Sequence, residues 1–354
     1  MSRFWSPLVG TLTPYKAGEQ PADPGVLKLN TNENPYGTSP RSLAAIAREL
    51  DQSLCRYPEP TAMRFRHAVA QHHGIDPAEV FVGNGSDEVL AHTFQALLNH
   101  ERPLLFPDIT YGFYRTYCAL YRIAFAEVPL NRDFRIRIAD FRRPCGAIIL
   151  ANPNAPTGIA MSVADIEALC SEHADQVVVI DEAYVAFGAE SAIPLVRTHP
   201  NLLVTQTLSK SHGLAGLRVG FAIGQAPLIQ ALERVRDSFN SYPVDRLAQV
   251  GAVAAWEDRD WFERHRDLII GNREHLASAL RQAGFEVLPS AANFLFVRHP
   301  KRSGAEFAAE LKARRILVRH FPGVRTGDYL RISIGKRPDC DRLLAALVDI
   351  VTRP

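Results

Sequence analysis

The chain has 354 residues, of which 47% are hydrophobic and 22% charged, so it can bury a large core and form two lobes. Its 40 basic and 38 acidic residues are mixed along the whole length and leave a formal net charge of +2, which excludes a basic stripe for nucleic acid. No stretch approaches the roughly 18 apolar residues of a membrane span. The five cysteines are scattered without a CxxC pair, so we expect neither disulfides nor a bound metal and predict a cytoplasmic protein.

Residues 1–40 are rich in proline, which removes backbone donors and fixes φ. We predict that they form an extended N-terminal arm and part of a small domain. The arm leaves no room before Asn30 for an added DNA-binding module, which argues against a transcription regulator.

From about Pro40 to Gly224 the chain alternates between amphipathic helical segments and short β-branched runs, a pattern typical of βαβ units. We predict a large α/β domain over residues 41–243, with a mostly parallel sheet flanked by helices. Two apolar stripes predict helices that face the core: Leu43, Ile46, Ala47 and Leu50, and then Leu90, Phe94, Leu97 and Leu98. Four runs are too short and too β-branched for helices and predict strands: residues 80–82, 147–150, 177–180 and 202–204.

Each predicted strand leads directly into a polar cluster. The clusters lie at residues 83–87, 152–154, 181–182 and 207–210. Ligands of open α/β sheets bind beyond the carboxyl ends of the strands, so we expect the four clusters to converge on one pocket.

After Gly224 the chain has a different character, with long helical segments near 227–239, 244–256 and 260–283 and two later strands near Ile316 and Ile332. We predict that residues 244–354 form a smaller α+β domain. The chain contains no internal repeat and no low-complexity tract.

Lys210 lies in a polar, glycine-rich segment that follows the last predicted strand of the large domain. Ser209 and Ser211 flank it, and Arg218 follows eight residues later. This pattern suits an aldehyde cofactor that carries a phosphate, because the lysine can form an imine while hydroxyls and guanidinium bind the dianion. The alternative is a solvated lysine in a surface loop.

Asp181 ends an apolar strand, so its carboxylate needs a cation nearby. A protonated pyridine nitrogen is such a cation, and a protonated ring draws electrons from the substrate Cα. Tyr184 could hydrogen-bond the phenolic oxygen of the ring, or be an ordinary amphipathic tyrosine.

The glycines of residues 83–88 permit a close backbone approach, and a helix that begins near Ser86 offers free N–H groups to a phosphate. Ser86 or Asp87 could also be no more than the helix N-cap. Tyr111 could stack on a pyridine face or be a plain aromatic residue. We give His212 no catalytic role, because Lys210 already provides a base where one is needed.

Four motifs of the chain resemble the fold-type I aminotransferases of class I and II, and most of all the histidinol-phosphate aminotransferases, over essentially the full length. They are LNTNENPYG at 29–37, RYPEP at 56–60, DEAY at 181–184, and the segment 209–220 with YLRISIG at 329–335 downstream. The segment 209–220 is specific for the superfamily. The first two motifs, together with LTPY at 12–15, point to the subfamily.

The resemblance implies pyridoxal phosphate bound as an imine on Lys210, with Asp181 at the pyridine nitrogen, Tyr184 at the ring oxygen and Tyr111 stacked on the ring. It implies a second group of residues around the phosphate, Gly85, Ser86, Thr207, Ser209 and Arg218, and it places Asp87 among the cofactor-binding residues.

The resemblance also implies a homodimer with shared active sites, in which Tyr57 reaches the cofactor of the neighbouring subunit. Arg331 would bind the acidic group of each substrate, assisted by Arg319 and Tyr15, with Asn34 also at the substrate. A planar, bidentate guanidinium suits both a carboxylate and a phosphate.

The run from Asn154 to Gly158 departs from the family pattern. The family has Asn-Pro-Thr-Gly here, whereas this chain has Asn-Ala-Pro-Thr-Gly, so Ala155 stands where an amide donor to the ring oxygen is expected. Either Asn154 supplies that hydrogen bond from one residue earlier, or Tyr184 supplies it alone. We favour Asn154.

The resemblance therefore implies transamination between L-histidinol phosphate and 2-oxoglutarate in histidine biosynthesis. Two alternatives share the cofactor motifs: a decarboxylase of the threonine-phosphate type and an aromatic amino-acid aminotransferase. A non-catalytic scaffold would have no need for a strand that ends in Asp181 or for a hydroxyl-flanked Lys210.

Overall fold

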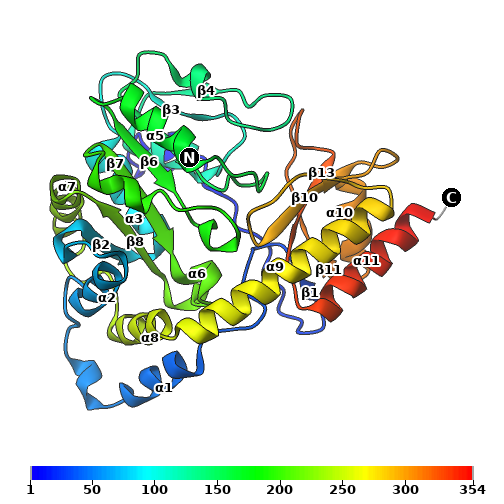
Figure 1. Ribbon diagram of the computed structural model, residues 1–354, viewed down its shortest axis with the longest axis horizontal. Coiled ribbons are helices and arrows are strands. Elements are labelled where there is room, and N and C mark those ends of the chain that lie inside the picture. The colour runs from blue at the N-terminus through cyan, green and yellow to red at the C-terminus, as the bar shows by residue number, and fades with distance from the viewer. Residues whose placement is uncertain (1, 353–354) are drawn as a thin grey trace.

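The larger lobe is built on a seven-stranded sheet with strand order β2-β8-β7-β6-β5-β3-β4 (Figure 1). The computed structural model describes residues 2–352. The strands are β2 (Val80–Asn84), β3 (Leu104–Pro107), β4 (Phe125–Val128), β5 (Ala147–Ala151), β6 (Val177–Asp181), β7 (Leu202–Thr207) and β8 (Val219–Gly224). Strand β8 runs antiparallel to β2 and β7, and the other neighbours are parallel. The predicted α/β class and all four predicted strands are confirmed.

Helices cover both faces of this sheet (Figure 1). They are α2 (Met63–His73), α3 (Gly85–Leu97), α4 (Phe113–Tyr121), α5 (Val163–Glu172), α6 (Leu208–Ser211), α7 (Ala226–Asp237) and α8 (Arg246–Glu257). Successive residues of β5 alternate between two cores, with Ile148 and Leu150 in one and Ala147 and Ile149 in the other. Burial on both faces explains why the central strands are continuous apolar runs rather than alternating ones.

The smaller lobe contains an antiparallel sheet with strand order β12-β13-β10-β9 and a parallel pair of β1 with β11. These strands are β1 (Leu27–Lys28), β9 (Glu286–Val287), β10 (Phe294–Arg298), β11 (Ile316–Leu317), β12 (Arg319–His320) and β13 (Tyr329–Ser333). Its helices are α9 (Arg259–Gln282), α10 (Gly304–Ala313) and α11 (Arg337–Thr352). Because β1 pairs with β11, the end of the N-terminal arm is part of this lobe.

Helix α1 (Pro40–Arg48) lies at the surface of the larger lobe. The prediction that its apolar stripe faces the core is wrong, because Leu43 is 56% exposed and Leu50, just beyond the helix, is 59% exposed. The second predicted stripe, on α3, is buried as expected. The exposed stripe leaves an apolar surface on one face of the protein.

Helix α8 packs with the larger lobe. Its Ala248, Ala252 and Trp256 belong to the same core as the central strands. The predicted boundary at residue 243 therefore separates α8 from the residues that bury it, and we propose a boundary within α9, which runs from α8 to the smaller lobe (Figure 1). No proline- or glycine-rich linker marks this position, because the connection is itself a helix.

Residues 2–352 lack two kinds of structural feature. None of the helices there is long and apolar enough to cross a membrane. That range also holds no group of three or more His, Cys, Asp or Glu side chains arranged to bind a metal ion.

Candidate active site

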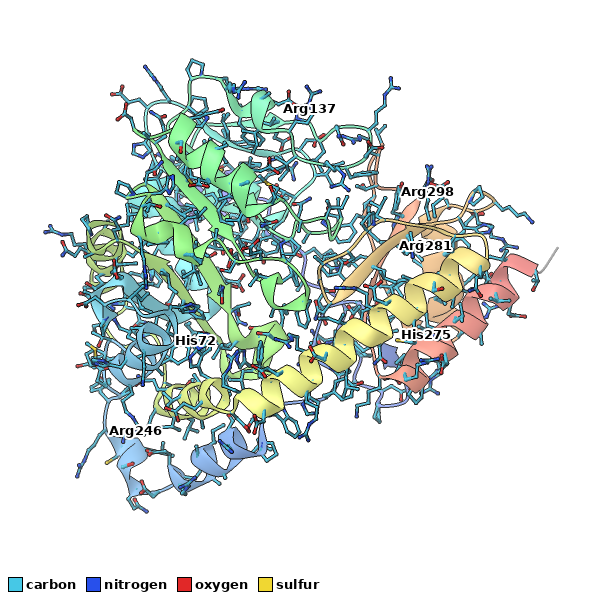
Figure 2. All side chains as sticks on the ribbon, viewed as in Figure 1. His72, Arg137, Arg246, His275, Arg281 and Arg298 are labelled. Carbon is cyan, nitrogen blue, oxygen red and sulfur yellow. The ribbon has the colours of Figure 1, made fainter. Side chains whose placement is uncertain are left out.

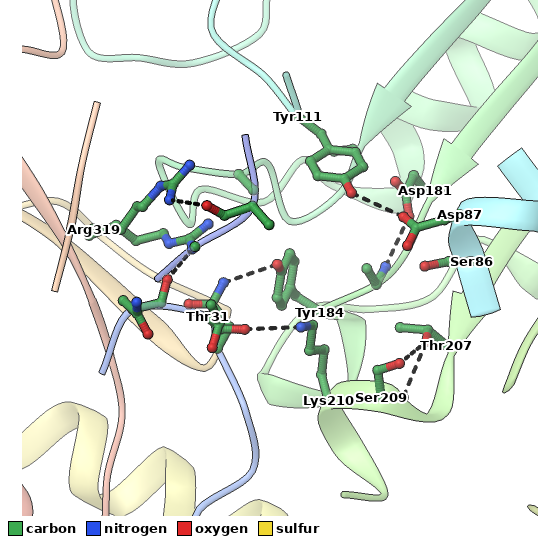
Figure 3. A pocket seen from close by; sticks show the side chains of 18 of the residues that line it. Thr31, Ser86, Asp87, Tyr111, Asp181, Tyr184, Thr207, Ser209, Lys210 and Arg319 are labelled. Carbon is green, nitrogen blue, oxygen red and sulfur yellow. Dashed lines mark hydrogen bonds between the residues drawn. The ribbon is translucent and has the colours of Figure 1, made fainter. Parts of the chain in front are cut away.

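A cavity of about 430 Å³ lies at the carboxyl ends of the central strands, and residues of both lobes line it (Figure 3). Twelve of the residues predicted from the sequence line it: Tyr15, Ser86, Asp87, Tyr111, Asp181, Tyr184, Thr207, Ser209, Lys210, Arg218, Arg319 and Arg331. The polar clusters that follow β2, β6 and β7 thus meet at one edge of the sheet, as the parallel arrangement requires.

Lys210 is carried by the short helix α6, directly after β7. Its ammonium group donates a hydrogen bond to the carbonyl oxygen of Thr31 at 3.1 Å (Figure 3). Burial, reinforced by the positive charge of Arg331, lowers the pKa of Lys210 to about 8. A substantial fraction of this amine is therefore neutral near pH 8, as a nucleophile or a proton acceptor requires.

Asp181 is the last residue of β6 and is only 5% exposed. Its Oδ2 accepts a hydrogen bond from the Tyr114 hydroxyl at 2.9 Å, and its Oδ1 accepts longer ones from the Ala183 N–H and the Thr205 hydroxyl. Burial raises the pKa of Asp181 to about 6, against the effect of these donors. The carboxylate is thus ionised at neutral pH but is held in a poorly hydrated place, where a cation would be stabilised.

The hydroxyls of Ser86, Thr207 and Ser209 lie on one side of the cavity (Figure 3), which Arg218 also lines. The Thr207 hydroxyl donates to Ser209 Oγ at 3.0 Å, and Arg218 Nη1 lies 3.5 Å from that same oxygen. Ser86 lies in the first turn of α3, whose N-cap residue makes no side-chain capping bond. Free N–H groups, two hydroxyls and a guanidinium together form a site for a phosphate dianion.

Two glycines allow this close approach. Gly85 has φ +78°, and a Cβ atom there would lie 2.2 Å from Arg218 Nη2. Gly220 on β8 faces the start of α3, and a Cβ atom there would lie 2.4 Å from the backbone nitrogen of Ser86. Gly85 therefore shapes the anion site through its backbone and does not itself line the cavity.

Tyr111 covers the cavity from the start of α4 (Figure 3). Its hydroxyl donates to Asp87 Oδ1 at 3.1 Å, and Arg218 Nη2 lies 2.9 Å from Asp87 Oδ2. Tyr15 of the N-terminal arm packs 6.2 Å from the Tyr111 ring, centroid to centroid. Asp87 thus orients both the tyrosine and the arginine.

Tyr184 is held by Asn32, a residue that no sequence pattern singled out. The side-chain amide of Asn32 donates to the Tyr184 hydroxyl at 3.0 Å, and Asn32 Oδ1 accepts from the Ser333 hydroxyl at 2.8 Å. Asn32 has φ +57° and is 1% exposed. The motif at residues 29–37 was visible in the sequence, but its contact with Tyr184 depends on how the arm crosses between the lobes.

The end of the cavity near the smaller lobe is lined by Arg331 of β13 and Arg319 of β12. Arg331 Nη2 donates to the carbonyl oxygen of Asn30 at 3.0 Å, while its buried Nε has no hydrogen-bond partner within residues 2–352. The nearby Asn30 Oδ1 and Thr31 hydroxyl are likewise buried without partners in that range. Buried groups of this kind are normally satisfied, so they indicate a bound polar ligand.

Besides Gly85, three further predicted residues do not line the cavity. The Asn154 amide donates to the Ile109 carbonyl oxygen and the Thr157 hydroxyl, and its Oδ1 accepts from the Thr110 hydroxyl. It therefore supports a loop, and our preference for it as the donor to the ring oxygen does not fit this geometry. Asn34 donates to the carbonyl oxygens of Lys210 and Ser211, so it holds the turn beneath the lysine.

Tyr57 is the third. It is 77% exposed and stacks on Tyr242, with ring centroids 4.4 Å apart. Its exposed ring thus lies outside the cavity of its own chain.

His212, two residues after Lys210, is buried between Trp256 and Phe262, with stacked rings 5.4 and 4.7 Å away. Burial lowers the pKa of His212 to about 3. A neutral imidazole packed in this way agrees with the absence of a catalytic role.

A second cavity of about 500 Å³ adjoins the first and shares with it Tyr15, Tyr111, Ala155, Arg319 and Arg331. It extends toward the loop of residues 321–326. A ligand bound at the two arginines can therefore extend away from Lys210.

Comparisons with known proteins agree with this geometry. Residues 24–347 match the family Aminotransferase class I and II. The chain is 62% identical to Histidinol-phosphate aminotransferase 1 of Bradyrhizobium diazoefficiens, covering 99% of this chain and 100% of that protein. It is 59% identical to Histidinol-phosphate aminotransferase 2 of Rhizobium meliloti, with the same coverage.

Solved structures of similar fold also include a histidinol-phosphate aminotransferase. The histidinol-phosphate aminotransferase of Sinorhizobium meliloti in complex with pyridoxal-5'-phosphate has a TM-score of 0.89 at 25% identity, covering 99% of this chain and 98% of that one. An L-threonine-O-3-phosphate decarboxylase of Porphyromonas gingivalis shares the fold, with a TM-score of 0.80 at 23% identity, covering 93% of this chain and 100% of that one. The chain therefore belongs to the class I and II aminotransferases and, within them, to the histidinol-phosphate aminotransferase family.

Proposed function

We propose that this protein is a pyridoxal-phosphate-dependent aminotransferase that converts L-histidinol phosphate and 2-oxoglutarate into imidazole acetol phosphate and L-glutamate, a step of histidine biosynthesis. The observation that carries the proposal is that Lys210, Asp181 and Arg331 line one cavity. The names of the relatives that are 62% and 59% identical over nearly the whole chain support the choice of substrate.

The donor set of the cavity fits the cofactor. The hydroxyls of Thr207 and Ser209, the guanidinium of Arg218 and the start of α3 suit its phosphate, Asp181 suits its ring nitrogen, and the Lys210 amine suits its aldehyde. When bound, pyridoxal phosphate supplies a carbonyl for the amino group and a ring that withdraws electrons from the substrate Cα.

Within this proposal the residues of the chain have separate tasks. Lys210 would hold the cofactor through its aldehyde and would move a proton at the substrate Cα. Asp181 keeps the ring nitrogen protonated, and Tyr184 donates to the ring oxygen without help from Asn154. Both substrates use the same cavity in turn, and the first product leaves before the second substrate binds, so we expect ping-pong kinetics.

Arg331 binds the acidic group of each substrate in turn, the carboxylate of glutamate or the phosphate of histidinol phosphate, and Arg319 and Tyr15 assist it. The partnerless Nε of Arg331, buried within the described chain, supports this role. The adjoining cavity gives the ring of histidinol phosphate room beyond the two arginines.

We also propose a cytoplasmic homodimer. Leu43, Leu50, Leu54 and Tyr57 are all at least 50% exposed on one stretch of chain around α1, an apolar surface that a second copy would cover. Arg246, labelled in Figure 2 beside this stretch, donates to the carbonyl oxygen of Tyr57 at 3.4 Å and pairs with Glu49. In the dimer, Tyr57 reaches the cofactor phosphate of the other subunit.

The five free cysteines are in keeping with a reducing compartment such as the cytoplasm.

A panel of half-reactions tests the proposal. Purified holoenzyme is mixed separately with histidinol phosphate, glutamate, phenylalanine, tyrosine and aspartate, and conversion to the aminated cofactor is followed by absorbance. We expect histidinol phosphate and glutamate to react fastest, without release of CO₂.

Two outcomes would contradict parts of the proposal. A preference for phenylalanine or tyrosine over histidinol phosphate would indicate an aromatic amino-acid aminotransferase. Release of CO₂ in place of amino transfer would indicate the decarboxylase whose fold the chain shares. A Lys210→Ala variant is the control, because it should lose nearly all turnover in every half-reaction.

A further inference from the structure

Tyr114 lies directly behind Asp181, on the side away from the cavity. It belongs to α4, is 0% exposed and is not among the residues that line the cavity. Its hydroxyl donates to Asp181 Oδ2 at 2.9 Å, the shortest of the hydrogen bonds that this carboxylate accepts among the described residues. Because Tyr114 does not line the cavity, it cannot touch a ligand there, and any effect on the site must act through Asp181.

The hydrogen bonds of Asp181 limit how it can face a ligand. A carboxylate has about four acceptor positions. Tyr114, Ala183 and Thr205 occupy three of them. A position thus remains for one further donor, and the side chain cannot rotate without losing the bond to Tyr114.

The same hydrogen bond affects the charge of Asp181. Burial raises the pKa of this carboxyl group, and the Tyr114 hydroxyl is the largest influence that lowers it. The neighbouring carboxylate of Asp87 acts in the opposite direction and raises it. Without the hydroxyl, the carboxylate would be a stronger base in the same dry place and would compete for the proton of any cation beside it.

We propose that Tyr114 is a positioning residue, whose hydroxyl holds Asp181 as an oriented anion so that the proton between Asp181 and the cofactor stays on the ring nitrogen. This inference rests on the proposed function, because it assumes that pyridoxal phosphate binds with its ring nitrogen at Asp181. It assigns two tasks to α4 and the residues just before it: Tyr111 covers the ring, and Tyr114, at the start of the helix, sets the charge of Asp181.

The competing explanation is that Tyr114 only fills space. Its ring packs against Phe94, Phe106 and Tyr111, with centroids 5.8, 6.0 and 5.6 Å away. Tyr114→Phe keeps these ring contacts and removes only the hydroxyl, so the variant separates the two explanations. Tyr121→Phe is the matched control, because it removes a hydroxyl from the last turn of the same helix.

The experiment uses holoenzyme reconstituted with pyridoxal phosphate labelled with ¹⁵N in the ring, whose chemical shift distinguishes a protonated from a neutral nitrogen. In Tyr114→Phe we expect the shift to move toward the neutral value, and kcat for glutamate to fall about tenfold or more while KM changes less than about twofold. The Tyr121→Phe and wild-type enzymes should agree in both measurements. Thermal unfolding shows whether each variant is folded.

An unchanged ¹⁵N shift in folded Tyr114→Phe would overturn the inference, even if the variant were less stable. Asp181→Asn separates this failure from a failure of the proposed function. If Asp181→Asn moves the shift and Tyr114→Phe does not, only the role of Tyr114 is wrong. If neither variant moves it, the pairing of Asp181 with the ring nitrogen is wrong, and the inference falls with it.

Discussion

Lys210 and Asp181 change their acidity in opposite directions inside one cavity. Burial lowers the pKa of Lys210 to about 8 and raises the pKa of Asp181 to about 6. Both groups are thereby brought closer to neutral pH than a lysine or an aspartate in water. Pairs of groups shifted toward neutrality are typical of sites that transfer protons.

The pH dependence of cofactor uptake should report the pKa of Lys210. The neutral amine attacks the aldehyde, so the rate at which apo protein incorporates pyridoxal phosphate should rise with pH through about 8 and then level off. In Arg331→Met the midpoint should move to higher pH, because the charge of Arg331 lowers the pKa of Lys210. Stopped-flow absorbance measures both.

Arg319→Met is the control for this measurement. It removes an arginine from the same cavity that is not among the main influences on the pKa of Lys210. A midpoint that stayed at its wild-type value in Arg331→Met, or that moved equally in both variants, would argue against the electrostatic coupling.

The geometry of the Arg331 guanidinium should matter as well as its charge. Arg331→Lys keeps one positive charge and loses the fork that binds a carboxylate through two N–H groups. We expect KM for glutamate to rise about tenfold, the equivalent of one lost charge-assisted hydrogen bond, with a smaller change in kcat. Steady-state kinetics measures this change. An unchanged KM in Arg331→Lys would mean that a single positive charge is enough to bind the substrate carboxylate.

Among the elements, those with strong local patterns were predictable. The strands at β5, β6 and β7 were evident because both faces of each are buried, which forces a short, continuous, β-branched run. The polar ends of β6 and β7 were recognisable as parts of one site because parallel strands end at one edge, whereas residues 152–154 after β5 do not line the cavity. Lys210 and Asp181 were found in this way.

Other features depend on relations that no local pattern contains. Asn154 was chosen for its residue type, but its amide is used by Ile109 and Thr157 in an irregular loop. The contact of Asn32 with Tyr184 joins residues 152 positions apart. The stripe of α1 has helical spacing, but spacing does not distinguish a core from a surface that another chain covers.

The junction of β8 with α3 gives a prediction for the phosphate site. In Gly220→Ala the new methyl group would meet the backbone of Gly85 and Ser86, which cannot move aside as a flexible side chain can. We expect α3 to shift, with the unfolding free energy lowered by about 1–3 kcal/mol and pyridoxal phosphate bound more weakly. Chemical denaturation and equilibrium dialysis measure the two effects.

Gly216→Ala provides the comparison, since nothing lies within 4 Å of a Cβ atom at that glycine. It should bind the cofactor as the wild type does. Equal losses in the two variants would mean that the close approach of β8 to α3 is not what shapes the anion site.

At the scale of the whole molecule, the exposed apolar residues near α1 predict the assembly. Leu54 is 50% exposed on this surface, and Leu54→Asp should convert the dimer to monomers because it would bury an unpaired charge. Leu268→Asp starts from a leucine 44% exposed on α9 and should leave the dimer intact. Sedimentation velocity at micromolar protein distinguishes these outcomes, and a dimeric Leu54→Asp protein would refute the interface.

The bond between Asn32 and Ser333 has a consequence for how the protein comes into being. These residues are 301 positions apart. Asn32 donates a hydrogen bond to the Tyr184 hydroxyl, and the Ser333 hydroxyl holds Asn32 in place. During synthesis the arm emerges from the ribosome early, but it cannot form this bond until β13, the last strand of the described chain, has been made. A nascent chain can fold much of its larger lobe in the meantime, but its catalytic centre closes only once translation is nearly finished.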